Sequence, residues 1–203
     1  MPDKKGDLHG SAPDKSDLAL LIIDVINDLD FPEAGQMLRF VPALTRNLTR
    51  LKERARAADV PVLYVNDNFG RWRSDVRALV DHCRASPGGK LVEFLEPAED
   101  DYFVLKPKHS GFFSSTLDTL LRKLGARRLI ITGIAGNFCV LFTANDAYMR
   151  DYELIVPSDC TISNTKRENR EALALMNRYL KANTAISSRI RFPRRPRRAK
   201  RSS

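Results

Sequence analysis

Short runs of continuous hydrophobic residues recur along this chain and constrain its fold more than any other feature. Six runs stand out, the last of them weakly: "LALLIID" (18–24), "VPVLYVN" (60–66), "YFVLK" (102–106), "RLIITG" (128–133), "ELIVPSD" (153–159) and "TAISS" (184–188). Because the stronger runs do not alternate between apolar and polar residues, each suits a strand that is buried on both faces, as in a parallel sheet.

Segments with the pattern of amphipathic helices lie between these runs. Helices are predicted over five ranges: 40–58, 71–84, 115–125, 137–152 and 166–182. A looser segment rich in Pro and Gly is expected over 86–99. Alternating strands and helices imply right-handed crossovers. The sequence therefore predicts an α/β fold, a three-layer doubly wound sheet of about six mainly parallel strands with helices on both faces.

Three chemically distinct side chains follow the predicted strands. Asp24 ends the first run, Lys106 ends the third, and Cys139 follows the fourth. In an open parallel sheet, ligands bind beyond the carboxyl ends of the strands. We therefore expect these three side chains to meet at one edge of the sheet and to form the functional site.

The position of Cys139 suits a nucleophile. It lies in the first turn of the predicted helix 137–152, directly after the small turn "GIAG". A helix N-terminus and the Lys106 ammonium are expected to lower the pKa of its thiol, because both favour the thiolate. Asp24 could accept the thiol proton, and the turn could aim backbone N–H groups at a developing oxyanion. Free cysteines are also often buried hydrophobic residues, so this position alone leaves a structural role open.

Three blocks of the sequence resemble the isochorismatase-like cysteine hydrolases, a superfamily that includes nicotinamidases and carbamoyl-amide hydrolases. The resemblance covers roughly residues 17–187, in the family's order: "LLIIDVINDLDFP", "VLKPKHSGFFSSTLDTLL" and "ITGIAGNFCVLFTANDAYMRDYELIVPSD". In the second block Lys106 stands four residues before Ser110, so Lys106 matches the family's lysine better than Lys108 does. One block alone is a weak signal, whereas three in order are specific.

The resemblance implies a mechanism for residues of this chain. Cys139 would attack a carbonyl or amidine-like carbon, Asp24 would act as general base and then general acid, and Lys106 would stabilise the thiolate and orient Asp24. The resemblance also implies a cis peptide bond between Ile134 and Ala135, which would direct the N–H groups of Ala135 and Cys139 into an oxyanion hole. No cofactor is expected for this chemistry.

Two departures from the family pattern bear on the substrate. Ile26 stands where the first block often carries Gln, and the stretch 66–72, "NDNFGRW", lacks the His of the nicotinamidases' Asp-x-His metal motif. A catalytic metal is therefore not expected, and nicotinamide becomes a less favoured substrate. Some family members that cleave vinyl ethers lack the nucleophilic cysteine, so Cys139 favours amide or ureide chemistry.

Substrate-binding residues are expected near the end of the second strand and beyond Lys106. The candidates are Asn66, Asn68, Phe69, Trp72 and His109. A lone Trp is also common in cores and interfaces, and His109 could instead cap a neighbouring group. The other cysteines, Cys83 and Cys160, are expected to have no catalytic role.

Charge and composition divide the chain into three parts. A polar arm (1–16) lacks the apolar segment of a secretory signal, and no run reaches the roughly 20 apolar residues that a membrane span needs. One domain is expected over 17–188. The segment 189–203 carries eight of the 34 basic residues and no acidic one, which leaves 26 basic against 25 acidic residues elsewhere. The few, widely spaced cysteines favour reduced thiols in a cytoplasmic protein.

The basic segment 189–203 is expected to be a disordered tail. It could contact nucleic acid, anionic lipid or another acidic surface. The absence of interleaved aromatic residues favours a solvated end over a nucleic-acid contact.

Three functions remain open from the sequence. The first is a metal-independent cysteine hydrolase acting on a small-molecule amide or ureide C–N bond. The second is an isochorismatase-type vinyl-ether hydrolase of the same fold. The third is a non-catalytic binding protein that uses its basic tail. The family resemblance also favours a homo-oligomer, either a dimer or a tetramer, without any membrane association.

Overall fold

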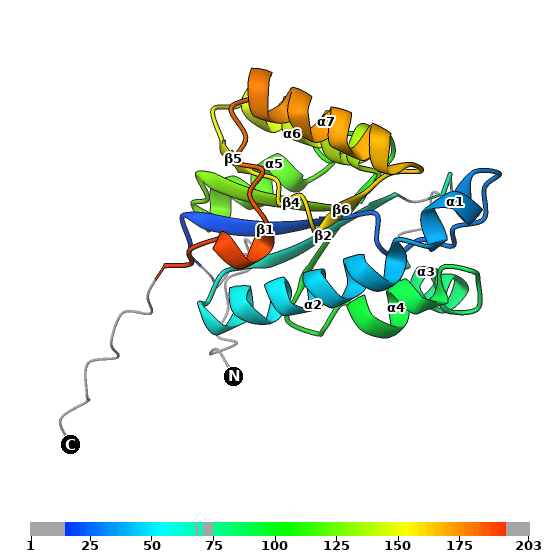
Figure 1. The fold of residues 1–203 in the computed structure, drawn as a ribbon. Helices are drawn as coiled ribbons and strands as arrows, with labels where there is room; N and C mark the ends of the chain where they lie inside the picture. The colour runs from blue at the N-terminus through cyan, green and yellow to red at the C-terminus, as the bar shows by residue number, and fades with distance from the viewer. Residues whose placement is uncertain (1–14, 68, 71–74, 194–203) are drawn as a thin grey trace, which may run out of the picture.

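A six-stranded parallel sheet forms the centre of the molecule, and helices cover both of its faces (Figure 1). The computed structural model describes residues 15–67, 69–70 and 75–193. The strands pair in the order β3-β2-β1-β4-β5, and β6 pairs with β4. Their bounds are β1 (Leu18–Ile23), β2 (Val62–Asp67), β3 (Tyr102–Lys106), β4 (Arg128–Ile134), β5 (Glu153–Ile155) and β6 (Thr161–Ile162). The predicted α/β class and parallel sheet are confirmed.

The first five predicted strands form where expected, but the predicted sixth strand is wrong. Within 184–188 no strand forms, because Ser187 donates from its backbone N and its Oγ to Asp159, at 2.6 and 2.8 Å. The sixth strand is instead the two-residue β6. A strand of two residues is too short to give a recognisable hydrophobic run.

The helices form two layers with the sheet between them (Figure 1). On one side of the sheet lie α2 (Val41–Ala57), α3 (Val76–Arg84) and α4 (Gly89–Leu95), and on the other lie α5 (Leu117–Leu124), α6 (Leu141–Tyr148) and α7 (Lys166–Tyr179). The short α1 (Ala34–Leu38) precedes α2. Local signals agree with these bounds: a complete capping box of Thr165 and Glu168 starts α7, and left-handed Gly125 ends α5.

Two helical predictions need correction. The segment 86–99, expected to be loose, contains α4, whose Leu91, Val92 and Leu95 are buried in the core. Gly88 explains why a Gly-rich stretch can begin a packed helix, because a Cβ there would lie 1.8 Å from the Asn27 carbonyl oxygen. The predicted helix over 137–152 starts as a π-helix, Gly136–Val140, before it continues as α6.

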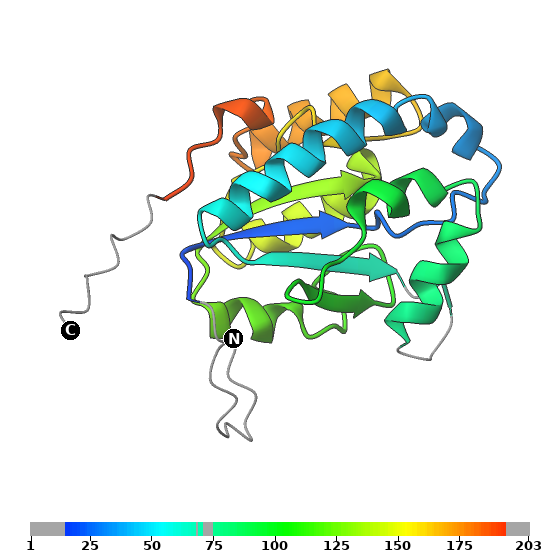
Figure 2. The same ribbon diagram turned by 90° about the horizontal axis from the view of Figure 1, so that it is seen from below.

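The sheet is buried on both faces, as continuous apolar runs predict. Alternate residues of β1 enter different cores: Leu18, Leu20 and Ile22 pack with α2 and α4, whereas Ala19 and Leu21 pack with α5 and α6. Figure 2 shows the arrows of β1 to β4 pointing in the same direction, so their carboxyl ends meet at one edge. This edge is where the sequence places Asp24, Lys106 and Cys139.

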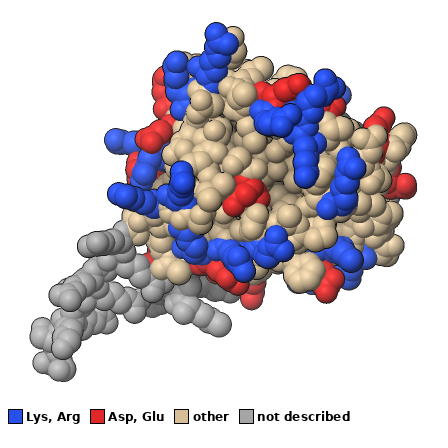
Figure 3. Space-filling model, viewed as in Figure 1, with Lys and Arg blue, Asp and Glu red and all other residues tan. Residues whose placement is uncertain are grey.

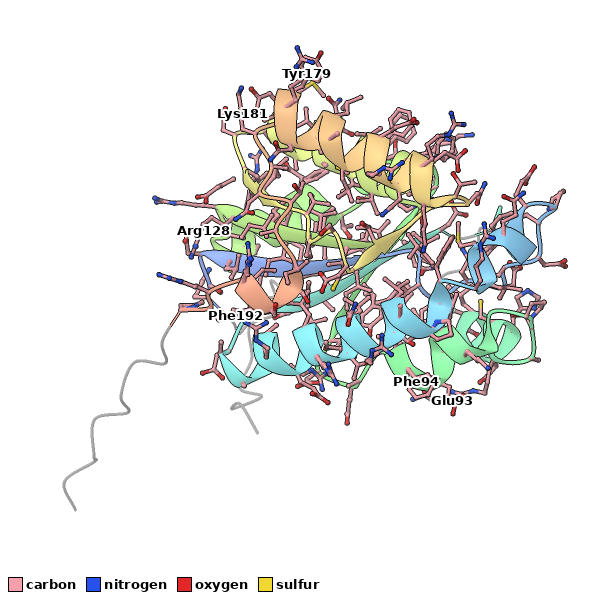
Figure 4. The ribbon with its side chains drawn as sticks, in the orientation of Figure 1. Glu93, Phe94, Arg128, Tyr179, Lys181 and Phe192 are labelled. Carbon is pink, nitrogen blue, oxygen red and sulfur yellow. The ribbon has the colours of Figure 1, made fainter. Side chains whose placement is uncertain are left out.

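The packed chain continues beyond position 188. Ile190 is buried, and Arg54 of α2 donates to the carbonyl oxygens of Ser187 and Ile190 at 2.8 and 2.6 Å. The Arg54 guanidinium also lies over the Phe192 ring, which is labelled in Figure 4. Most of the predicted tail, residues 194–203, and most of the predicted arm, residues 1–14, lie outside the described residues.

The surface charge of the described part is mixed. On the face seen in Figure 3, Lys and Arg side chains are scattered together with Asp and Glu side chains. This distribution agrees with the near balance of charges that the sequence shows outside 189–203. None of the described helices is long and apolar enough to cross a membrane.

Gly133 is a position where the fold requires glycine, and the requirement can be tested through the free energy of unfolding. Its φ is +110°, and a Cβ there would lie 2.0 Å from the Ile23 carbonyl oxygen of the neighbouring strand. We expect Gly133→Ala to lower the free energy of unfolding by about 3 kcal/mol or more, measured by urea denaturation. The control Gly35→Ala, which meets no atom within 4 Å, should change it by less than about 1 kcal/mol. Equal effects of both variants would contradict the close approach of β4 to β1.

Candidate active site

The three side chains that the sequence singles out meet at the carboxyl edge of the sheet. The Lys106 Nζ lies 2.8 Å from Asp24 Oδ2 and 3.7 Å from Cys139 Sγ. Lys106 is completely buried, Asp24 is almost completely buried, and Cys139 is partly accessible. The expected convergence of these residues is thus what the structure shows.

The sheet places Asp24 and Lys106 through its parallel register. Asp24 follows β1 directly, and its backbone N donates to the Val65 carbonyl oxygen of β2 at 3.1 Å. Its φ of +48° turns the chain away from the sheet, in a region that Asp tolerates better than most residues. Lys106 is the last residue of β3 and pairs in register with Asp67, the last residue of β2.

Asp67 adds a second carboxylate to the site. Its backbone N donates to Asp24 Oδ1 at 2.7 Å, and its own Oδ2 lies 3.6 Å from Lys106 Nζ. Lys106 also donates to the Lys108 carbonyl oxygen at 3.1 Å. The buried ammonium therefore has three oxygen partners, which offset the cost of removing it from water. Asp24 is fixed on both oxygens, one by Lys106 and one by the Asp67 backbone.

Close packing of the chain after β4 positions Cys139. The π-helix Gly136–Val140 follows β4, and a Cβ on Gly136 would lie 2.2 Å from Asn169 Oδ1 of α7. The backbone N of Asn137 donates to Ser163 Oγ at 3.1 Å, which ties the same turn to the chain after β6. The peptide bond between Ile134 and Ala135 is cis, as the sequence predicted.

The electrostatics of the site differ from the sequence expectation for Cys139. Burial and the Asp24 carboxylate raise the pKa of the Cys139 thiol to about 12, although Lys106 opposes them. Burial also raises the pKa of Asp24 while Lys106 opposes it. Burial tends to lower the pKa of Lys106, but Asp24, Cys139 and Asp67 together raise it. The predicted lowering of the thiol pKa is therefore wrong, because burial and a nearby carboxylate outweigh the ammonium.

The predicted substrate residue Asn66 has a different position from the one expected. Its side chain is completely buried and bonds to both backbone groups of Ile26, accepting from its N at 3.1 Å and donating to its O at 2.8 Å. Asn66 is therefore a support for the loop after Asp24 and does not line the cavity. Ile26, which stands where the family often has Gln, is itself fully buried.

The other substrate-binding candidates lie at the periphery or outside the described residues. Phe69 is partly buried against the core, and its backbone N donates to Asp67 Oδ1 at 2.7 Å. His109 is exposed and packs on Phe138, with ring centroids 4.2 Å apart, and thus lies beside the cavity rim. Asn68 and Trp72 belong to the positions outside the described residues.

A cavity of about 430 Å³ opens next to Cys139. Its described lining comes from the end of β4 and from the chain that follows β1, β4 and β6, including α1 and the π-helix: Asp24, Asn27, Phe31, Glu33, Met37, Ile134, Ala135, Asn137, Phe138, Cys139 and Asn164. Most of these residues were not predicted as site residues. What these residues share is their position, because each lies at or after the carboxyl end of a strand, at the edge of the sheet that carries Asp24.

No metal site stands out in the part of the chain that the structure describes. Among residues 15–67, 69–70 and 75–193, no group of three or more His, Cys, Asp or Glu side chains is arranged to hold a metal ion. The polar groups at and behind the cavity wall are held by one another, through the contacts of Lys106 with Asp24, Asp67 and Cys139.

Comparison with known proteins agrees with this fold. The Isochorismatase domain family matches residues 18–189. The chain therefore belongs to the isochorismatase family, and it is a hydrolase of that family. It is 41% identical to the uncharacterized isochorismatase family protein YaaI of Bacillus subtilis (strain 168), over 87% of this chain and 97% of that protein.

Two further relatives carry names that describe amide chemistry. The ureidoacrylate amidohydrolase RutB of Serratia proteamaculans (strain 568) is 30% identical over 70% of this chain and 68% of its own length. The crystal structure of N-carbamoylsarcosine amidase from Thermoplasma acidophilum superposes with a TM-score of 0.62 at 26% identity. That match covers 86% of this chain and 99% of the amidase chain.

The buried ion pair at the site makes a prediction for stability. Lys106→Met leaves the Asp24 carboxylate buried without its partner, so we expect a loss of about 3–5 kcal/mol in the free energy of unfolding near pH 7. Without Lys106 the pKa of Asp24 rises further above its value in the unfolded chain. A group with a raised folded-state pKa stabilises the protein below its unfolded pKa and loses this effect as pH rises. The loss should therefore be smaller near pH 4–5 than near pH 7.

The double variant Lys106→Met/Asp24→Asn is the matched control, because it removes both charges. It should recover part of the stability that Lys106→Met loses near pH 7, in urea denaturation of both proteins. A loss that is the same at both pH values and is not relieved by Asp24→Asn would show that Lys106 contributes through packing alone.

Proposed function

We propose that this protein is a metal-independent cysteine hydrolase that cleaves a small-molecule amide or ureide C–N bond through an acyl-enzyme on Cys139. One observation carries the proposal: a buried ammonium, Lys106 Nζ, lies 2.8 Å from a carboxylate and 3.7 Å from a thiol, and the carboxylate and the thiol both line a cavity. A nucleophile, a base and a group that orients the base are the parts that covalent catalysis needs.

The first step is attack by Cys139 on the substrate carbonyl. The raised pKa of its thiol means that Cys139 is protonated at neutral pH, so a base must remove the proton as the sulfur attacks. Asp24 is that base, since its charge and its hydrogen bond to the thiol both act on the pKa of Cys139. Lys106 keeps Asp24 in place and balances the negative charge while the proton moves.

The carbonyl oxygen becomes negative during this attack and needs hydrogen-bond donors. The backbone N–H groups of Ala135 and Cys139 are the proposed donors, because both residues line the cavity where the carbonyl would lie.

The proton that Asp24 took from the thiol is needed to release the leaving group. Asp24 passes it to the departing nitrogen, the C–N bond breaks, and a thioester remains on Cys139. Water then attacks the thioester carbon while Asp24 takes a proton from the water, and the thiol leaves with that proton. The products are an amine or ammonia and a carboxylic or carbamic acid, and the enzyme returns to its starting state.

The relatives support amide chemistry over other hydrolytic reactions. RutB is named as an amidohydrolase and the Thermoplasma acidophilum protein as an amidase, and this chain resembles each of them over two thirds of their length or more.

Kinetics on a panel of primary amides and carbamoyl compounds test the proposal through ammonia release. Cys139→Ala should abolish turnover, and Asp24→Asn should reduce kcat by at least about 100-fold, within the range of general acid–base catalysis. The matched control is Cys83→Ala, which removes a buried thiol of α3 that lies outside the cavity lining. It should keep the turnover of the folded enzyme.

Mass spectrometry of the intact protein during turnover gives a second readout. It should show an added acyl group on the wild type and none on Cys139→Ala. Amide turnover that survives in Cys139→Ala would contradict covalent catalysis by Cys139.

A further inference from the structure

The charged side chains that line the cavity in the described part of the chain are all acidic, and their sign affects which substrates can enter. Of the residues that line the cavity in the described part of the chain, the charged ones are Asp24 and Glu33, and both are carboxylates. Asp24 is neutralised by Lys106, which lies behind it and is already bound to three oxygens. Glu33 forms no ion pair within the described residues.

Glu33 owes its position to the chain between β1 and α1. It immediately precedes α1, and its side chain makes no hydrogen bond that caps this helix, so its exposed carboxylate is not used by the helix. Phe31 from the same segment and Met37 from α1 line the cavity beside it. The segment thus presents the Glu33 carboxylate to the cavity next to an apolar wall.

Three side-chain amides line the same cavity. The Asn27 Oδ1 accepts from the Leu29 backbone N at 2.8 Å, which leaves its amino group as the free end. The side chains of Asn137 and Asn164 have no hydrogen-bond partner among the described residues. Amide groups can donate to a carbonyl and accept from an N–H group, so they suit a neutral amide or urea and do not select for charge.

We propose that Glu33 makes this cavity select substrates whose group away from the scissile amide is neutral or cationic, and that it disfavours carboxylates. The inference deepens the proposed function, because it names the substrate class of the same site. A second carboxylate entering the cavity would meet Glu33 without a free cation among the described lining residues, and like charges at close range repel. A cationic group would instead gain a partner there.

The first test uses Cys139 as a reporter and needs no substrate. Three methanethiosulfonates of similar size carry different charges: a trimethylammonioethyl reagent, an uncharged alkyl reagent and a sulfonatoethyl reagent. Peptide mass spectrometry measures the rate at which each one modifies Cys139. The cationic-to-anionic rate ratio should fall about fivefold in Glu33→Gln, reverse in Glu33→Lys, and shrink with added salt because Glu33 is exposed.

Glu93→Gln is the matched control. Glu93 lies on α4, is labelled in Figure 4, and does not line the cavity. This variant changes the net charge as Glu33→Gln does, so it should leave the rate ratio unchanged within about twofold. A ratio that is the same in wild type, Glu33→Gln and Glu33→Lys overturns the inference, as does a faster anionic reagent in the wild type.

The second test separates this inference from the proposed function. Hexanamide, 6-aminohexanamide and the monoamide of adipic acid share the scissile group and differ in charge at the far end. We expect wild-type kcat/KM to be lowest for the acid, and Glu33→Lys to raise it for the acid alone. If these amides are hydrolysed with the acid preferred, the inference fails while the amide chemistry stands. If no amide is hydrolysed but Cys139 modification depends on Glu33, the amide proposal fails and the charge selection stands.

Discussion

The buried ion pair between Lys106 and Asp24 is the interaction on which the rest of this site depends. An ammonium without solvent contact is costly, and it is tolerated here because oxygens of Asp24, Asp67 and Lys108 surround it. The order β3-β2-β1-β4 brings these groups together, because Lys106 ends β3, Asp67 ends β2 and Asp24 follows β1. Cys139 then enters from the chain after β4, the other neighbour of β1.

In the proposed mechanism the Asp24 carboxylate is the base that acts on the thiol. Burial raises the pKa of the Cys139 thiol, so the thiol is protonated near neutral pH and this mechanism needs a base. In that mechanism Lys106 keeps Asp24 charged, and Asp24 takes the thiol proton and returns it to the leaving nitrogen. In the proposed charge selection, Glu33 acts on the remainder of the substrate, because it lines the same cavity.

Much of the fold and of the site centre could be predicted from the sequence. Buried parallel strands leave continuous apolar runs, so β1 to β5 were evident, and Asp24, Lys106 and Cys139 follow three of them. Other features leave no such trace. β6 has two residues, and α4 begins in a stretch rich in glycine whose Gly88 and Gly89 are explained by the close approach of the Asn27 and Arg84 carbonyl oxygens. The position of Asn66 and the pKa of Cys139 depend on burial and on partners distant in sequence, and the place of Glu33 at the cavity depends on how the chain folds; no local pattern records these features.

The most direct test of the central claim is a titration of the Cys139 thiolate by its ultraviolet absorbance. The signal is the difference between a protein and its Cys139→Ala counterpart, followed from about pH 5 to about pH 10. The account predicts no thiolate in the neutral range for the wild type, and a lower thiol pKa in Asp24→Asn, because the carboxylate is gone while Lys106 remains. A fully formed thiolate below about pH 7 in the wild type, unchanged in Asp24→Asn, would contradict the account, because a resting thiolate needs no base.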